Sequence, residues 1–386
     1  MLRVPTSHPK LLRYTPATSD GRRVWGSLPA IAHPNFTLGG AWHYSPNRSA
    51  KSLFDGRNRE KLGKMRLDEL VSLNSYYFMG LGKKTVGKDG CKKIYKTLDE
   101  KSVIIVFDND EKFIYFPTQV SIPTYYPLIE VKLPDKISAV LMDLDGTSVK
   151  SEHFWIWAIQ QVIATLLKNY DFKFAEEDIP HVSGYSISEH LKYGINKYCK
   201  GIKEVTLENA RNIYFEIVHR ELQNVLDGKP VRELSFEPAP FLKEFLLTLK
   251  EKDVKIGLVS SGLYEKSAPE IKAAFNKLGL GKPTEFYDAI VTAGFNVKKG
   301  QFGTLGELEP KPHPWLYAEA LHGLNIPKDG VIGIEDSGAG ILSLIAAQIP
   351  AIGIGGGNIE LGGEKPLCSL FFNDLGKVLN WIKDKI

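Results

Sequence analysis

From residue 137 onward, short apolar runs alternate with segments in which apolar residues recur every three or four positions. The second pattern predicts helices at 241–252, 268–279, 314–324, 339–348 and 375–386. The apolar runs predict strands at 137–144, 254–261, 288–294, 330–336, 350–356 and 369–372. Strands that alternate with helices predict an α/β fold, here a doubly wound, Rossmann-like parallel sheet with its strand ends gathered at one edge.

A long insertion separates the first two predicted strands. Residues 151–238 contain amphipathic helical stretches, FWIWAIQQVIATLLKN (154–169) and LENARNIYFEIVHRELQNVL (207–226), and carry no strand signal. We interpret the insertion as a helical cap that can close over the mouth of the sheet. The core then consists of residues 136–150 and 239–386.

The amino-terminal third has a different pattern. Residues 1–135 begin as an irregular stretch rich in Pro, Gly and Tyr. The apolar stretches SVIIVFD (102–108) and KFIYFPTQV (112–120) follow, with a turn at NDE between them, which predicts a β-hairpin. We expect a separate amino-terminal accessory module of unknown role that contains some β structure.

Composition adds the broad class. The chain has 386 residues, of which 43% are hydrophobic and 24% charged, as in a soluble globular protein. Its three cysteines, Cys91, Cys199 and Cys368, form no CxxC pair, so no zinc site or disulfide framework is indicated. The most apolar window, 340–357, contains Gln348 and Pro350, and no membrane helix is expected. We expect a cytoplasmic protein, with organelle targeting by the acid-free first 19 residues as the alternative.

Charge is shared unevenly along the chain. Residues 1–135 contain 21 Lys+Arg and 13 Asp+Glu, a net charge of +8, whereas the remainder contains 28 and 32, a net charge of −4. A solvated surface is the commoner explanation of such an excess. Binding of nucleic acid through the basic residues of 1–135 is the alternative.

Polar residues follow four of the predicted elements in order. They are DLDGT at 143–147, LVSSG at 258–262, Lys311 within EPKPHPWLY, and GIEDS at 333–337. Asp143 and Asp145 stand two apart where a buried strand ends, and their charges repel unless a cation sits between them or one carboxyl keeps its proton. The carboxyl ends of parallel strands meet at one edge of a sheet, so we expect a site there.

These four motifs and their order resemble the haloacid dehalogenase (HAD) superfamily of hydrolases. The insertion after the first motif resembles the helical cap of its β-phosphoglucomutase-like and phosphatase branch. The resemblance covers roughly residues 137–375. It implies an enzyme, a HAD-type phosphohydrolase that cleaves phosphoric monoesters.

The resemblance assigns the catalytic roles. Asp143 is the expected nucleophile, which forms an aspartyl-phosphate. Asp145, kept protonated part of the time by its neighbour's charge, is the expected acid and base. Lys311 is expected to supply positive charge to both the nucleophile and the phosphoryl group. His313, two residues later, is expected to be a loop residue without a catalytic role.

The resemblance also implies a metal, and Mg²⁺ is the expected ion. Its predicted ligands are Asp143, the backbone carbonyl of Asp145, Asp336 and Glu335. Related sequences often carry a second acid a few residues after the fourth motif. Here Gly340 stands at that place, and Glu335 is expected to replace the missing acid.

The remaining site predictions concern phosphate and substrate. Expected phosphate-binding residues, besides Lys311, are Gly146, Thr147, Ser260 and Ser261. The cap stretch HVSGYSISEHL resembles a specificity loop, and its Gly184, Tyr185 and Ser186 are expected to face the leaving group. Lys150 stands where related sequences commonly have Asp, which weakens inference of the substrate from this segment. Residues 296–310 are expected to form an additional loop that borders the entrance.

The sequence therefore predicts a Mg²⁺-dependent phosphatase that acts on a small phosphorylated metabolite, such as a sugar phosphate. Two alternatives stay open. A phosphomutase of the same fold would pass the phosphoryl group to a sugar hydroxyl, and a binding or regulatory protein would use the HAD domain as a scaffold. A dehalogenase is disfavoured because haloacid chemistry needs neither Asp145 nor the acids of GIEDS. The sequence indicates no oligomeric state.

Overall fold

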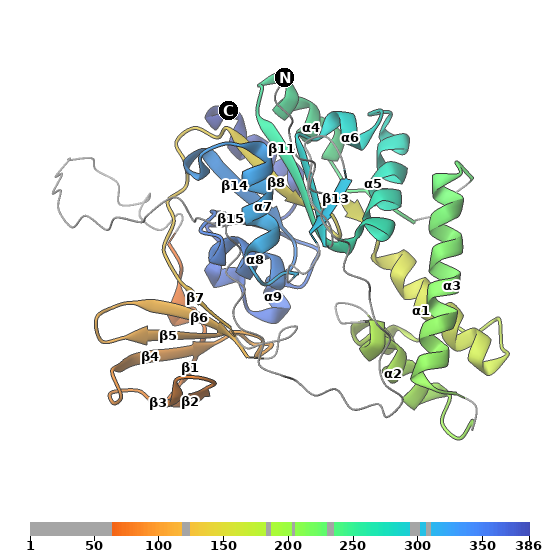
Figure 1. Ribbon diagram of the computed structural model, residues 1–386, viewed down its shortest axis with the longest axis horizontal. Helices are drawn as coiled ribbons and strands as arrows, with labels where there is room; N and C mark the ends of the chain where they lie inside the picture. Colours follow the sequence, from red (N-terminus) through yellow and green to blue (C-terminus); the bar gives the residue numbers. More distant parts are fainter. Residues whose placement is uncertain are drawn as a thin grey trace, which may run out of the picture. The chain divides into compact units, whose positions relative to one another are not determined.

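A computed structural model describes residues 64–117, 124–182, 187–202, 205–229, 235–293, 302–305 and 310–386 (Figure 1). All of them belong to one unit of the chain, Gly56–Ile386. None of the helices in these ranges combines the length and the apolar character that crossing a membrane requires.

A seven-stranded parallel sheet forms the core, in the order β13-β12-β11-β8-β14-β15-β16. The predicted α/β fold is confirmed, and six of the strands correspond to the predicted apolar runs, one of them continuing two residues past its run. They are β8 (Ala139–Asp143), β11 (Lys255–Leu263), β12 (Ala289–Ala293), β14 (Val331–Glu335), β15 (Ala351–Ile354) and β16 (Leu370–Phe372).

The seventh strand corrects the prediction of a loop at 296–310. Within that stretch, β13 (Phe302–Leu305) pairs in parallel with β12, from Ile290↔Phe302 to Ala293↔Leu305. A four-residue edge strand has little local signal, because its pairing with a distant segment decides its conformation.

Helices cover both faces of this sheet (Figure 1). Side chains alternate along β8: Val140 and Met142 pack on one side, whereas Ala139 and Leu141 pack on the other. The first side is covered by α4 (Leu242–Glu251), α5 (Tyr264–Leu278) and α10 (Leu375–Ile382), and the second by α7 (Trp315–Leu324) and α8 (Gly338–Ala346). Burial on both faces explains why the strands read as continuous apolar runs. The short helix α6 (Pro283–Phe286) packs on the first side and the short helix α9 (Ile359–Gly362) on the second.

The insertion leaves and re-enters the core through a two-stranded antiparallel ribbon, β9 (Val149–Lys150) and β10 (Glu237–Pro238). Its described residues form α1 (Glu152–Leu167), α2 (Ile187–Tyr198) and α3 (Leu207–Leu226). The Thr206 side chain caps α3 by accepting a hydrogen bond from the Asn209 amide, 3.1 Å away. Helix α3 packs against α1, α2 and α5, so the helices of the insertion also contact the core.

A second sheet precedes the core. It is antiparallel, in the order β1-β4-β5-β6-β7, and a separate hairpin pairs β2 with β3. The predicted β-hairpin corresponds to β5 and β6. The strands are β1 (Val71–Leu73), β2 (Ser75–Phe78), β3 (Gly82–Thr85), β4 (Cys91–Lys96), β5 (Val103–Phe107), β6 (Lys112–Phe116) and β7 (Thr124–Pro127).

Both faces of this antiparallel sheet are buried. Val103, Ile105 and Tyr115 pack with Phe78 of the β2–β3 hairpin. On the opposite face, Ile104, Val106, Ile114 and Phe116 belong to the same apolar cluster as residues of α7 and α8. The antiparallel sheet and the parallel-sheet core therefore share one apolar cluster. The domain boundaries predicted at 135/136, 150/151 and 238/239 stay predictions.

The basic excess of the amino-terminal third is not in this sheet. Residues 64–135 contain 11 Lys+Arg and 10 Asp+Glu and are nearly neutral. The excess lies in residues 1–63, which are outside the described residues. The net basic charge on which the nucleic-acid alternative depends therefore lies outside the described residues.

Candidate active site

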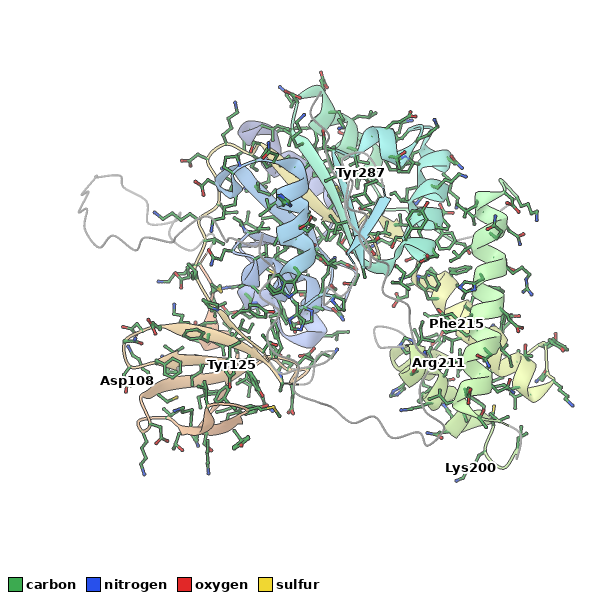
Figure 2. All side chains as sticks on the ribbon, viewed as in Figure 1. Asp108, Tyr125, Lys200, Arg211, Phe215 and Tyr287 are labelled. Carbon is green, nitrogen blue, oxygen red and sulfur yellow. The ribbon has the colours of Figure 1, made fainter. Side chains whose placement is uncertain are left out.

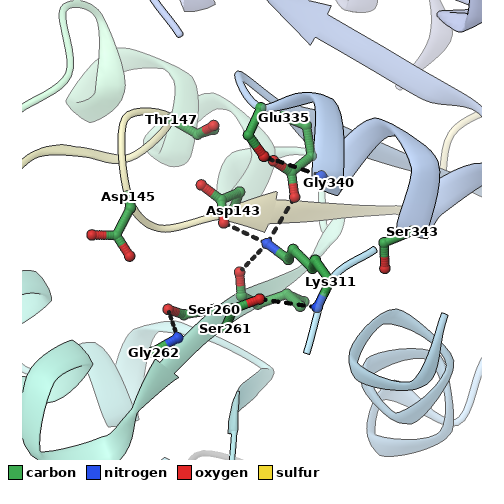
Figure 3. Close-up of polar contacts among 12 residues, drawn as sticks. Asp143, Asp145, Thr147, Ser260, Ser261, Gly262, Lys311, Glu335, Gly340 and Ser343 are labelled. Carbon is green, nitrogen blue, oxygen red and sulfur yellow. Dashed lines mark hydrogen bonds and ion pairs between the residues drawn. The ribbon is translucent and has the colours of Figure 1, made fainter. Parts of the chain in front are cut away.

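The side chain of Lys311 joins two carboxylates at the carboxyl edge of the parallel sheet (Figure 3). Its Nζ lies 2.5 Å from Oδ1 of Asp143, the last residue of β8, and 2.7 Å from Oε1 of Glu335, the last residue of β14. It also donates to the carbonyl oxygen of Val259 in β11, at 3.0 Å. Burial alone would lower the pKa of Lys311, but the two carboxylates outweigh burial and raise it. Lys311 is therefore a buried, charged ammonium group.

Three carboxylates meet at this point. Oxygen atoms of Asp143, Glu335 and Asp336 all lie within 4.8 Å of one another, and all three residues are buried. Burial, and then the charge of Glu335, raise the pKa of Asp143 well above its ordinary value and that of Asp336 to about 7. The single positive charge of Lys311 does not balance three carboxylates, so the cluster has an excess of negative charge. Carboxylate oxygens are the donors that Mg²⁺ and other hard cations prefer, so these residues fit such an ion.

Asp145 does not share the surroundings of Asp143. Strand β8 ends at Asp143, and in Figure 3 the Asp145 carboxylate points away from that of Asp143. Its Oδ1 lies 3.0 Å from Nζ of Lys266 and accepts a 2.8 Å hydrogen bond from Ser151. Burial raises the pKa of Asp145, but Lys266 and Ser151 outweigh it and lower the pKa. The prediction that the charge of Asp143 keeps Asp145 partly protonated is wrong for this arrangement.

Two glycines make room for carboxylates. Gly146 has φ +81°, and a Cβ there would lie 1.9 Å from Oδ2 of Asp336. A Cβ at Gly340 would lie 1.9–2.2 Å from the carboxylate atoms of Glu335. The Glu335 carboxylate thus fills the space beside Gly340. That Glu335 replaces the acid missing at position 340 stays a prediction.

The other predicted site residues make contacts around this cluster. Thr147 donates from Oγ1 to Oδ1 of Asp336, at 3.3 Å. The buried Ser260 hydroxyl accepts from the Gly262 amide at 2.9 Å, and Ser261 Oγ accepts from the backbone amide of Lys311 at 3.1 Å. These hydroxyls thereby hold the carboxyl end of β11 and the loop that carries Lys311. The predicted cap residues Gly184, Tyr185 and Ser186 lie outside the described residues.

Some residues at the site were not predicted from the sequence. The Lys311 ammonium lies 5.0 Å from the centre of the Tyr317 ring, and the Tyr317 hydroxyl donates to Glu335. Tyr317 is a polar aromatic residue in the apolar stripe of α7, which is a weak signal for a hydrogen-bonded core tyrosine. Lys266 of α5 contacts both Asp145 and Glu270, which lies four positions later on the same helix, and nothing in the sequence shows that Lys266 reaches Asp145.

Comparison with known protein families agrees with the four motifs, all of which lie within the matched residues. The sequence model of the haloacid dehalogenase-like hydrolases matches residues 140–354. This match covers more than half of the chain, and the protein therefore belongs to that family. It is an enzyme of the HAD phosphohydrolase class. The match begins at β8, so the antiparallel sheet lies outside it.

The individual proteins that match this chain have low sequence identity to it. "Putative pyrophosphatase PpaX" of Caldanaerobacter subterraneus subsp. tengcongensis is 26% identical over 252 residues, 64% of this chain and 96% of that protein. Beta-phosphoglucomutase of Bacillus subtilis is 28% identical over 232 residues, 59% of this chain and 88% of that enzyme. Among solved structures, CbbY from Rhodobacter sphaeroides in complex with phosphate matches with a TM-score of 0.46 and 16% identity. That match covers 63% of this chain and 96% of CbbY.

Proposed function

We propose that the protein is a Mg²⁺-dependent phosphatase that hydrolyses a small phosphorylated metabolite through an aspartyl-phosphate on Asp143. The observation that carries the proposal is the buried Lys311 ammonium in contact with both Asp143 and Glu335 at the carboxyl edge of the sheet. Phosphoryl transfer needs an in-line nucleophile and positive charge around the equatorial oxygens. Asp143 and Lys311 supply these two requirements side by side.

Asp143, Glu335 and Asp336, together with the backbone carbonyl of Asp145, would hold the metal. Bound Mg²⁺ supplies positive charge to the phosphoryl oxygens. The chain contributes further donors, because Ser260, Ser261 and the backbone amide of Thr147 lie at the strand ends that surround Asp143. The amide of Gly146 already donates to the carbonyl oxygen of Val149, at 2.7 Å, so Gly146 contributes the open backbone beside the phosphate. We assign these groups to binding of the phosphate.

The proposed reaction has two steps. A carboxylate oxygen of Asp143 attacks phosphorus, the bond to the leaving oxygen breaks, and that oxygen takes a proton from Asp145. Water then attacks the phosphorus of the aspartyl-phosphate and gives a proton to Asp145, which releases inorganic phosphate and restores Asp143. The contact with Lys266 favours the carboxylate form of Asp145, which is the form that the second step needs. The first step requires Asp145 to leave Lys266 and take up a proton.

The substrate class follows from the relatives and from the cap. The relatives named above are a pyrophosphatase and a sugar phosphomutase by name, so a small phosphorylated metabolite such as a sugar phosphate is the proposed substrate. We assign selection of the leaving group to Gly184, Tyr185 and Ser186. We also place the enzyme in the cytoplasm. The beta-phosphoglucomutase relative makes phosphomutase activity the second candidate.

The test is release of inorganic phosphate from a panel of phosphorylated metabolites that includes hexose 1- and 6-phosphates, with Mg²⁺ and with EDTA. The intact protein is compared with Asp143→Asn and with a control, Asp253→Asn, whose side chain is 97% exposed. We expect metal-dependent turnover that Asp143→Asn abolishes and Asp253→Asn keeps. Interconversion of hexose phosphates without phosphate release would favour the mutase. Turnover that survives in Asp143→Asn would refute the nucleophile.

A further inference from the structure

The loop that carries Lys311 is held from outside the parallel sheet. His313 lies two residues after Lys311 and is only 2% exposed. Its Nδ1 shares a 2.7 Å hydrogen bond with the hydroxyl of Tyr126 on β7, the last strand of the antiparallel sheet. The two residues are 187 positions apart in the sequence, so the contact joins the amino-terminal sheet directly to a catalytic loop.

Two further contacts hold the same histidine. The Phe116 ring of β6 meets the His313 ring edge-on, with centroids 5.8 Å apart and an interplanar angle of 84°. From the core, the Ser343 hydroxyl of α8 donates to the carbonyl oxygen of His313 at 2.6 Å. His313, two residues after Lys311, is therefore held between the antiparallel sheet and α8.

The position of this loop matters because Lys311 has to reach several acceptors at once. Its Nζ contacts Asp143, Glu335 and the carbonyl of Val259 at 2.5–3.0 Å. A lysine side chain has four rotatable bonds, and its end is placed accurately only if its backbone is held. Misplacement of a reacting group by about 1 Å can lower a rate about 100-fold.

We propose that Tyr126 is a positioning residue that acts on Lys311 through His313, and that the antiparallel sheet is therefore part of the catalytic unit. The inference rests on the proposed function for the role of Lys311. It assigns a task to a part of the chain that lies outside the family match at 140–354. Without the Tyr126 contact, His313 keeps its bond to α8 but loses its hydrogen bond to the sheet, and the backbone of the lysine loop gains freedom.

Neighbouring tyrosines offer a matched test. Tyr126→Phe removes the hydroxyl that bonds to His313. Tyr125, labelled in Figure 2, lies in the antiparallel sheet. Tyr125→Phe removes a hydroxyl that donates to the carbonyl oxygen of Met79 at 3.0 Å, a bond within the amino-terminal part. Both variants of the full chain keep an aromatic ring on β7. They differ in whether the lost bond leads to the catalytic loop.

Two readouts separate positioning from general destabilisation. The first is kcat for the best phosphorylated substrate, which we expect Tyr126→Phe to lower by roughly tenfold and Tyr125→Phe to leave within about twofold. The second is the rate at which a small amine-acylating reagent labels Lys311, followed by mass spectrometry. The Lys311 side chain is 5% exposed, so labelling of the intact protein should be slow and Tyr126→Phe should accelerate it.

A second pair of variants tests the same bond from the other side. His313→Leu removes the partner of Tyr126 and should reproduce both effects. His313→Asn keeps a polar group close to the place of Nδ1 and should restore part of the activity. Equal kcat and equal labelling in Tyr126→Phe and the intact protein would overturn the proposal, as would equal effects of Tyr125→Phe. If the intact protein has no phosphatase activity, the proposed function fails, but the labelling rates still decide whether Tyr126 positions Lys311.

Discussion

The contact between Gly340 and Glu335 makes a sharp prediction about the acidic cluster. In Gly340→Ala, the new Cβ would lie 1.9 Å from Cδ of Glu335 and 2.0–2.2 Å from its two oxygens. Real Cβ atoms essentially never come closer than 3.0 Å to such atoms, so the carboxylate has to move by about 1 Å. It cannot do so without disturbing its contacts with Lys311, Tyr317 and Ser337.

The size of the effect follows from those contacts. Breaking a buried ion pair costs about 3–5 kcal/mol, because one charge is left without its partner. The higher helix propensity of alanine than glycine in α8 returns about 1 kcal/mol. We expect a net loss of about 2–4 kcal/mol in the free energy of unfolding. Because Lys311 contacts the Glu335 carboxylate that is displaced, kcat/KM should also fall by about 100-fold.

The assay is phosphate release over a range of Mg²⁺ concentrations, with urea denaturation of the same samples. A double-mutant cycle supplies the control. In the background of Glu335→Ala the methyl group of Gly340→Ala meets no carboxylate, so the second substitution should leave kcat/KM unchanged and stabilise the fold slightly. Glu335→Ala combined with Gly340→Asp should recover part of the activity, because it returns an acid to the cluster from α8.

Wild-type activity and Mg²⁺ dependence in Gly340→Ala would refute this reasoning, because the carboxylate of Glu335 would then have moved without consequence. An equal loss from Gly340→Ala in both backgrounds would also contradict it. That result would show that the methyl group acts through the helix and not through Glu335.

Two further predictions concern buried carboxyl groups. Burial, and then the charge of Asp99, raise the pKa of Glu364 to about 8, so the folded protein binds the extra proton and stability falls as pH rises from about 4.5 to 8. Glu364→Gln should remove up to about 4 kcal/mol of that dependence, and parallel urea-denaturation profiles of both proteins from pH 5 to 9 would disprove it. Burial raises the pKa of Asp178, but the hydrogen bonds from Lys197, Tyr193 and Tyr198 outweigh burial and lower the pKa. Asp178 therefore stabilises the folded protein fully above pH about 4, and this stabilisation is lost progressively in more acidic solution. Asp178→Ala should cost about 2 kcal/mol more at pH 7 than at pH 2 in urea denaturation, and an equal cost at both pH values would contradict the assignment.

Local patterns were sufficient to predict most of the fold. The apolar runs of β8, β11 and β14 were readable because each is buried on both faces of the sheet, and the periodicity of α4, α7 and α8 follows from their one buried side. The β5–β6 hairpin was readable from two apolar stretches around a turn. Strand β13 was missed, because four residues at a sheet edge are ordered by their partner strand and not by their own composition.

The main residues of the site were also readable, because strand ends in a parallel sheet converge on one edge. Asp143, Lys311, Glu335 and Asp336 were named from motifs and their order, and the structure brings them together. The protonation of Asp145 was not readable. It depends on Lys266, which lies 121 positions away and reaches Asp145 only because α5 packs beside the end of β8.

The sequence by itself determined the class of fold, the order of its elements and the residue types at the carboxyl edge, since these depend on local periodicity and on short motifs. Only the tertiary structure decided that Lys311 contacts the carboxylates of both Asp143 and Glu335. It also decided that Gly340 leaves room for Glu335 and that Tyr126 hydrogen-bonds to His313. Those features depend on distances between segments far apart in the chain. Packing of the whole core sets these distances, and no local pattern encodes them.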